Sequence, residues 1–243
     1  MLRRFSSRLR EQDWVAVIIE LSIVVAGVFL GIEAANWNEG RRDRAEEKRY
    51  YQQIIVDLQR DIRSFESAKA RSLANDRAAE TILDALDHGL PPNVDPADFA
   101  KDVHLAGFLY LPTSSRRTYD ELISTGNLRL LRDRKAKDAI AAYYENFAEL
   151  RQWDSLLRQQ QADYWAGSAG VVPRRVLQAA VANTPLQMTT TEAQAILARA
   201  RGNPRLKPML IGMAAHQARA RRDAVGLEGE ARALIKELQP LGG

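Results

Sequence analysis

Residues 14–40 read WVAVIIELSIVVAGVFLGIEAANWNEG, and this stretch decides how the chain is organised. Residues 14–32 form a run of 19 residues in which Glu20 is the one charged side chain. A helix rises 1.5 Å per residue, so the run spans roughly 28 Å, close to the hydrocarbon thickness of a bilayer. We therefore expect a basic tail over residues 1–13 and a transmembrane anchor over residues 14–35.

A cleaved signal peptide is the alternative, because a basic tail precedes the apolar run, with Arg3, Arg4, Arg8 and Arg10. The apolar part of a signal peptide is typically about 7–15 residues long and ends at a small-residue cleavage site. This run is longer, and the sequence Glu33-Ala34-Ala35 that follows it is a poor cleavage site. The sequence therefore favours an uncleaved, single-pass anchor.

The orientation in the membrane is less strongly encoded, because basic residues also follow the span: Arg41, Arg42, Arg44, Lys48 and Arg49. Charges next to a span set its orientation, but long domains cross the membrane largely regardless of charge. The short N-terminal tail is then the better guide. We expect the N-terminus inside the cell and the large C-terminal domain outside.

Composition excludes several classes of protein. The 243 residues include 35 basic and 31 acidic side chains, and this mixture does not resemble the basic stripe of a nucleic-acid-binding protein. The absence of cysteine excludes disulfides, thiolate metal sites and thiol catalysis. We therefore expect no nucleic-acid partner.

Apolar residues after the anchor recur at helical spacings of three and four, which predicts an all-α fold. We expect the transmembrane helix to continue into a long stalk helix, and residues 36–243 to form an antiparallel helical bundle. Its long helices are expected at about residues 38–87, 133–167 and 204–238. The apolar segment at residues 107–112 could be extended, but six residues cannot form a sheet.

The last long helix has the most regular pattern. Its apolar positions alternate steps of four and three, a 3.5-residue period typical of coiled-coil seams: Leu206, Leu210, Met213, Gln217, Ala220, Ala224, Leu227, Ala231, Leu234 and Leu238. The many alanines imply that the partner helix approaches closely.

Three helix starts have recognisable caps. Asp95 followed by Pro96 predicts an N-cap and a first helical position. Thr118-x-x-Glu121 and Thr189-x-x-Glu192 have the spacing of capping boxes, in which each side chain bonds the other's backbone N–H.

Glu20 is the unusual residue of the anchor. A helix turns about 100° per residue, so Gly27 and Gly31 return to within roughly 20° of the direction of Glu20. This small-xxx-small face lets transmembrane backbones approach closely. We expect it to pack against another transmembrane helix, its own copy or that of a partner protein. Two other interpretations stay open: Glu20 reaches the headgroups, or it handles protons as in ion-driven stators.

The expected partners are thus the lipid bilayer and a second transmembrane helix. Trp14 and Trp37 stand at the two ends of the span, where aromatic rings commonly anchor a helix at the membrane interface.

Two blocks of sequence resemble an uncharacterised family of bacterial single-pass membrane proteins, a domain of unknown function. The first block matches through Glu20, Gly27, Asn36-Trp37-Asn38-Glu39, Asp57 and Leu58, and the chain departs from the family pattern at Glu33 and in its longer alanine-rich C-terminal part. The second resembles a family segment through Thr118, Tyr119, Leu122, Ser124, Gly126, Asn127, Leu128 and Tyr143. The resemblance supports the anchor, implies that the second block is packed, and implies a location in the bacterial inner (cell) membrane. With the orientation expected from the basic tail, the C-terminal domain is then periplasmic. It implies no activity, substrate or catalytic residue.

No catalytic, metal or cofactor site is predicted. His88, His104 and His216 are far apart in sequence, whereas zinc needs three or four ligands. Residues 114–117, Ser-Ser-Arg-Arg, could hold an anion at a helix N-terminus, although a capped loop is the simpler interpretation. Two classes of function remain: a non-enzymatic interaction, scaffold or sensor module, and an enzyme whose site cannot be recognised from sequence. We favour the first.

Overall fold

The computed structural model describes the backbone of residues 5–243 and the side chains of Trp14 and residues 16–243. The arginine side chains of the predicted basic tail, Arg3, Arg4, Arg8 and Arg10, lie outside the described part. Residues 5–243 are helical and contain no strand, which confirms the all-α prediction. The elements are α1 (Phe5–His88), α2 (Pro96–Leu105), α3 (Arg117–Ser124), the 3-10 helix η1 (Asn127–Leu130), α4 (Arg134–Arg151), α5 (Asp154–Gly167), α6 (Arg174–Ala182), α7 (Thr190–Arg201) and α8 (Leu206–Gly242).

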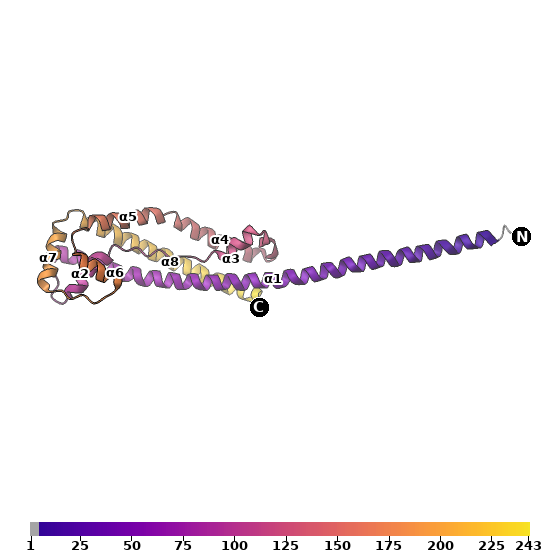
Figure 1. Ribbon diagram of the computed structural model, residues 1–243, viewed down its shortest axis with the longest axis horizontal. Helices are drawn as coiled ribbons and strands as arrows, with labels where there is room; N and C mark the ends of the chain where they lie inside the picture. The colour runs from indigo at the N-terminus through magenta and orange to yellow at the C-terminus, as the bar shows by residue number, and fades with distance from the viewer. Residues whose placement is uncertain (1–4) are drawn as a thin grey trace.

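Helix α1 is 84 residues long and has two different halves (Figure 1). Its N-terminal half projects from the bundle, and every side chain at residues 16–39 is exposed. An 18-residue window there has a mean hydropathy of 2.2, so the segment is long and apolar enough to cross a membrane. From Tyr50 onward the same helix is part of the protein core, with Ile54, Leu58 and Phe65 fully buried. A single backbone therefore links the apolar segment to the folded domain.

Helix α8 runs back along the domain half of α1, so that its C-terminal end lies beside Gln52 (Figure 1). The predicted seam of α8 is confirmed, since nine of its ten positions are buried and Ala220 alone is half-buried. Small residues such as Ala224 and Ala231 sit where the two helices meet, and each is at most 1% exposed. The paired helices α1 and α8 therefore run along the length of the domain.

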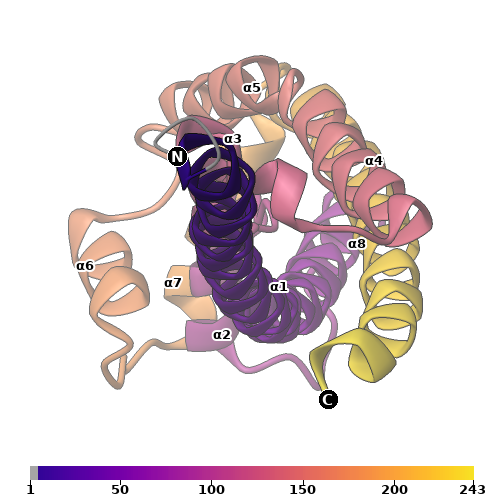
Figure 2. The same cartoon turned by 90° about the vertical axis from the view of Figure 1, so that its right-hand side faces the viewer.

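The remaining helices surround this pair (Figure 2). Near the projecting half of α1, the core contains Leu58, Phe65, Tyr144 and Leu234, from α1, α4 and α8. At the far end of the bundle a second core packs residues of α1, α2, α5, α6, α7 and α8: Ile82, Phe99, Tyr164, Val176, Ile196 and Leu210. Residues 107–112, for which an extended form was considered, are irregular and join α2 to the loop before α3.

The prediction of one long helix over residues 133–167 is wrong, because this segment forms two helices, α4 and α5. The break falls at Gln152 and Trp153, whose N–H groups donate to the carbonyls three residues earlier, at 3.1 and 3.4 Å. These short-range bonds tighten the backbone locally and end the α-helical pattern. Neither glycine nor proline occurs there, and the one sign of a new helix is Asp154-Ser155, residue types common at helix starts.

Two of the three predicted caps are confirmed, and one is wrong. The Asp95 side chain accepts from the N–H groups of Ala97 and Asp98, and the capping box of Thr189 and Glu192 has both of its bonds. By contrast, α3 begins at Arg117, one residue before the expected N-cap Thr118. The Thr118 N–H bonds a side chain of α1 instead of Glu121.

The seam predicts a matched pair of variants. Ala231 is fully buried between α8 and α1, whereas Ala233 is exposed on the same helix. We expect Ala231→Leu to lower the free energy of unfolding by about 1–3 kcal/mol, since extra carbon atoms must displace packed neighbours. Ala233→Leu should change it by less than about 0.5 kcal/mol. Urea unfolding of the full chain in lipid nanodiscs, followed by circular dichroism, measures both. Equal effects would mean that the seam is not tightly packed.

Candidate functional site

The predicted packing face of the apolar segment is open in the single chain. Glu20, Gly27 and Gly31 are exposed, and nothing lies within 4 Å of the position that a Cβ atom would occupy on either glycine. Because α1 is unbroken, the three residues share one side of the helix as expected. The bundle covers none of them, so their packing against another transmembrane helix stays a prediction.

The two predicted interface anchors are also exposed, Trp14 at 68% and Trp37 at 67%. They are separated by 23 residues of helix, a rise of roughly 35 Å that exceeds the hydrocarbon thickness by a few ångströms. The Arg41 guanidinium lies over the Trp37 ring, 5.2 Å from its centroid. This geometry suits two membrane interfaces, and the anchoring role stays a prediction.

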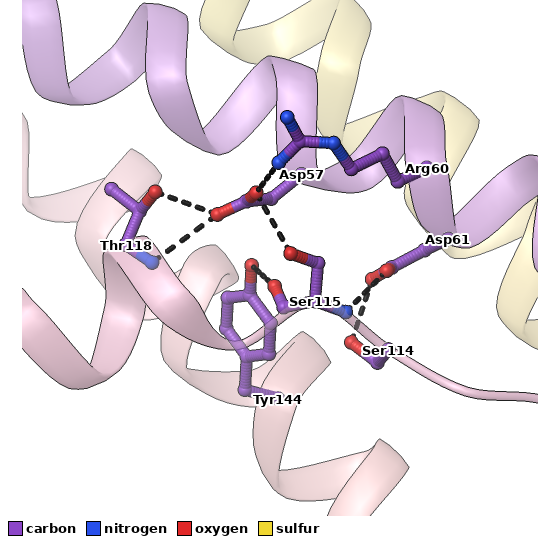
Figure 3. Close-up of polar contacts among 7 residues, drawn as sticks. All are labelled: Asp57, Arg60, Asp61, Ser114, Ser115, Thr118 and Tyr144. Atoms are coloured by element: carbon purple, nitrogen blue, oxygen red, sulfur yellow. Dashed lines mark hydrogen bonds and ion pairs between the residues drawn. The ribbon is translucent and has the colours of Figure 1, made fainter.

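The most elaborate polar site is a carboxylate cluster where α1 meets the start of α3 (Figure 3). We use this name for Asp57 and Asp61 together with the groups that bond them: Arg60, Ser114, Ser115, Thr118 and Tyr143. The two aspartates are four residues apart on α1, and they are only 2% and 1% exposed. Buried carboxylates are rare unless they are bonded on all sides.

Asp57 fastens the N-terminus of α3 to α1 (Figure 3). One carboxylate oxygen accepts from the backbone N–H of Thr118 at 3.2 Å and from its hydroxyl at 2.6 Å. The other accepts from the Ser115 hydroxyl at 2.8 Å and from the Arg60 guanidinium at 2.9 Å. Asp57 thus supplies the negative charge that a helix N-terminus favours.

Asp61 holds the loop just before α3. It accepts from the Ser114 hydroxyl at 2.6 Å, the Ser115 N–H at 2.5 Å and the Tyr143 hydroxyl at 2.8 Å. Burial raises the pKa of the Asp61 carboxyl even though these three donors act to lower it. Burial, with the neighbouring Asp61, also raises the pKa of the Tyr143 phenol. Tyr143 therefore stays protonated and acts as a donor at neutral pH.

The cluster has little capacity for an external ligand. Asp57 also lines a polar groove of about 450 Å³ with Arg49 and Arg117, but its oxygens already accept four hydrogen bonds from its own chain. The anion site considered for residues 114–117 is thus occupied by aspartates of α1. The carboxylate cluster therefore attaches α3 and the loop before it to α1.

Sequence reasoning missed Asp57 and Asp61 as partners of Ser114 and Ser115. A signal does exist, because Asp61 lies seven residues after Ile54 and three after Leu58, within the apolar stripe of α1. A polar residue on a buried stripe needs a partner. The sequence does not indicate that this partner lies 53 residues away in a loop.

The three histidines remain separate in the structure. His88 pairs with Asp84 at 2.8 Å on an exposed turn, His104 stacks on Trp165, and His216 borders an apolar pocket beside α5. Within the part of the chain that the structure describes, no three metal-ligating side chains come together.

Protein-family models, curated proteins and solved structures give no match to this chain. The resemblance to a family of bacterial single-pass membrane proteins accordingly stays a prediction from the two sequence blocks.

The carboxylate cluster predicts a large effect for Asp57→Ala. The change leaves the N–H and hydroxyl of Thr118 and the hydroxyl of Ser115 without their acceptor in a buried setting. We expect a loss of about 2–4 kcal/mol in the free energy of unfolding. Asp84→Ala, which removes an exposed carboxylate of the same helix, is the matched control and should stay within about 0.5 kcal/mol. Denaturant unfolding in nanodiscs reports both values, and a loss below 1 kcal/mol for Asp57→Ala would show that the cluster is dispensable.

Proposed function

We propose that the protein is a non-enzymatic interaction, scaffold or sensor module of the bacterial envelope, anchored in the cell membrane by residues 14–35. One observation carries the proposal: α1 is a single helix whose apolar segment is exposed throughout residues 16–39, while its C-terminal half is the centre of the folded domain. Exposed apolar surface of this extent requires a bilayer or another apolar partner. The domain of residues 36–243 then stands on a stiff stalk above the membrane.

The hydrogen bonding of Asp61 supports a binding role over catalysis. Burial raises the pKa of Asp102 to about 6, with a further contribution from Asp98, and burial raises that of Asp61. A perturbed carboxylate suggests catalysis when it faces a cleft where a substrate can sit. Asp61 is instead bonded to three groups of its own chain.

Within the membrane, we place the partner on the face of Glu20, Gly27 and Gly31. A lone carboxylate near a helix centre costs roughly 2.5–3.5 kcal/mol on insertion scales. A hydrogen bond or a proton shared with a neighbouring helix reduces this cost, and the two glycines let that helix come close. The free space around both glycines supports this assignment.

We assign the N-terminus to the cytoplasm and the helical domain to the periplasm. The support is the short basic tail, because its charges are retained inside while long domains cross largely regardless of charge.

Crosslinking within the membrane tests the packing face. With a photoreactive residue at position 24, beside this face, the full chain in bacterial membranes should form a crosslinked complex with itself or with another protein. Gly27→Ile and Glu20→Leu should each reduce its yield at least about tenfold, by steric exclusion and by loss of the polar contact. Glu20→Gln, which can still hydrogen-bond, should retain most of it.

Ala26→Ile is the matched control, since it places the same side chain about 120° away from Glu20. Equal yields for wild type, Gly27→Ile, Glu20→Leu and Ala26→Ile would contradict a specific packing face and leave Glu20 as a headgroup contact.

The orientation has its own test. In cells whose outer membrane has been opened, an added protease should remove the domain of residues 36–243 and leave an N-terminal epitope tag protected. Digestion should need no lysis of the inner membrane. Protection of the domain until the inner membrane is lysed would place it in the cytoplasm and reverse the assignment.

A further inference from the structure

An apolar pocket lies where α4, α5 and α8 meet the loop before α3. Its wall is formed by Phe147 and Leu150 of α4, Leu157 of α5, Ala220 and Leu227 of α8, and Leu111 of the loop. Ala220 is the one half-buried position in the seam of α8, so the seam opens at the pocket. The pocket has a volume of about 100 Å³.

Two half-exposed apolar side chains extend this surface outward. Trp153 also lines the pocket and is 48% exposed, and Leu156, one turn into α5, is 46% exposed. Trp153 lies at the break between α4 and α5, and Leu156 follows it in the first turn of α5. The apolar surface therefore continues from an enclosed interior to solvent.

Four charged residues around the pocket form two ion pairs. A nitrogen of the Arg151 guanidinium lies 2.9 Å from a carboxylate oxygen of Asp154, and Arg219 lies 3.8 Å from Asp223 and over the ring of Trp153. The two pairs balance in charge, so they favour neither an anionic nor a cationic occupant. Recognition must come from the apolar interior.

Size restricts the occupant. A dry cavity of about 150 Å³ in another protein binds benzene, which implies about 25 Å³ per carbon atom, so this pocket takes about four carbons. A chain that continues over Trp153 and Leu156 would bury about two more. A protein partner would need about 800 Å² of complementary surface on each side, far more than two exposed side chains provide.

The position along α1 excludes a lipid that stays in the bilayer. Phe147 contacts Phe65 of α1, with ring centroids 6.3 Å apart. Phe65 is 28 residues beyond Trp37, which is about 42 Å of helix. If Trp37 marks the membrane surface, an acyl chain anchored there cannot reach the pocket.

We propose that this pocket binds the end of a short, unbranched alkyl chain carried by a water-soluble amphiphile, with the chain end beside Phe147 and the following carbons over Trp153. The head group stays in solvent near the ion-paired side chains. The site gives the anchored domain a small-molecule ligand in addition to any membrane partner.

Quenching of tryptophan fluorescence by ω-bromo carboxylates tests the proposal, with the full chain in phospholipid nanodiscs. The chain lacks cysteine, which removes the most reactive target for such bromides. From 4-bromobutanoate to 6-bromohexanoate, the Kd should fall about three- to fourfold for each added methylene. It should then level off for 8-bromooctanoate and 10-bromodecanoate, whose extra carbons stay in solvent. 6-Bromohexanol should bind within about threefold of 6-bromohexanoate.

Three variants assign the signal. Trp153→Phe should abolish the saturable quenching. Ala220→Leu, which fills the pocket, should raise the Kd for 6-bromohexanoate at least about tenfold. Ala215→Leu adds the same bulk at an exposed position of α8 and should leave the Kd unchanged. The chain-length plateau and the Trp153→Phe result hold even if Ala220→Leu fails to fold.

Absence of saturable quenching would overturn the proposal. So would an affinity that keeps rising to 10-bromodecanoate and persists in Trp153→Phe, because that behaviour belongs to partitioning into the bilayer.

Discussion

One unbroken helix, α1, joins an exposed apolar segment to the core of the folded domain, and the rest of the structure depends on this continuity. Over residues 16–39 every side chain is exposed, and from Tyr50 onward the same helix provides the central surface of the domain. Helix hydrogen bonds are satisfied within the segment, so the backbone tolerates both environments without a break. The side chains alone change, from an apolar surface on all sides to a single buried stripe.

The domain is organised by two kinds of contact with α1. The first is the close approach of α8, whose alanines allow the helices to pack along most of the domain. The second is the carboxylate cluster, through which Asp57 and Asp61 attach the loop and α3. Leu111 in the same loop forms part of the apolar pocket, so the cluster also holds one wall of that pocket in place.

Much of the fold could be predicted from sequence because helical periodicity is a local property. The apolar stripe of α1, the 3.5-residue seam of α8 and the caps at Asp95 and Thr189 all depend on residues close together in the chain. The break at Gln152 and Trp153 was not predicted, since glycine and proline are absent there and Asp154-Ser155 alone is a weak signal. The cap of α3 was missed for a related reason: its acceptor, Asp57, is 61 residues away from Thr118. The carboxylate cluster and the apolar pocket likewise need contacts between distant segments, which one sequence does not reveal.

Continuity of α1 has a further consequence, for the direction in which the domain faces. An unbroken helix fixes the angular phase between all its residues, and Asp57, 37 positions after Glu20, lies roughly 100° around the axis from it. The carboxylate cluster therefore lies at a fixed angle about the helix axis relative to the Glu20 face. Inserting one residue into α1 between Glu20 and Asp57 would rotate the domain by about 100° about the helix axis relative to the Glu20 face. Inserting seven residues would nearly restore the original angle. If another helix packs against the Glu20 face within a membrane, this phase fixes which side of the domain lies above that helix.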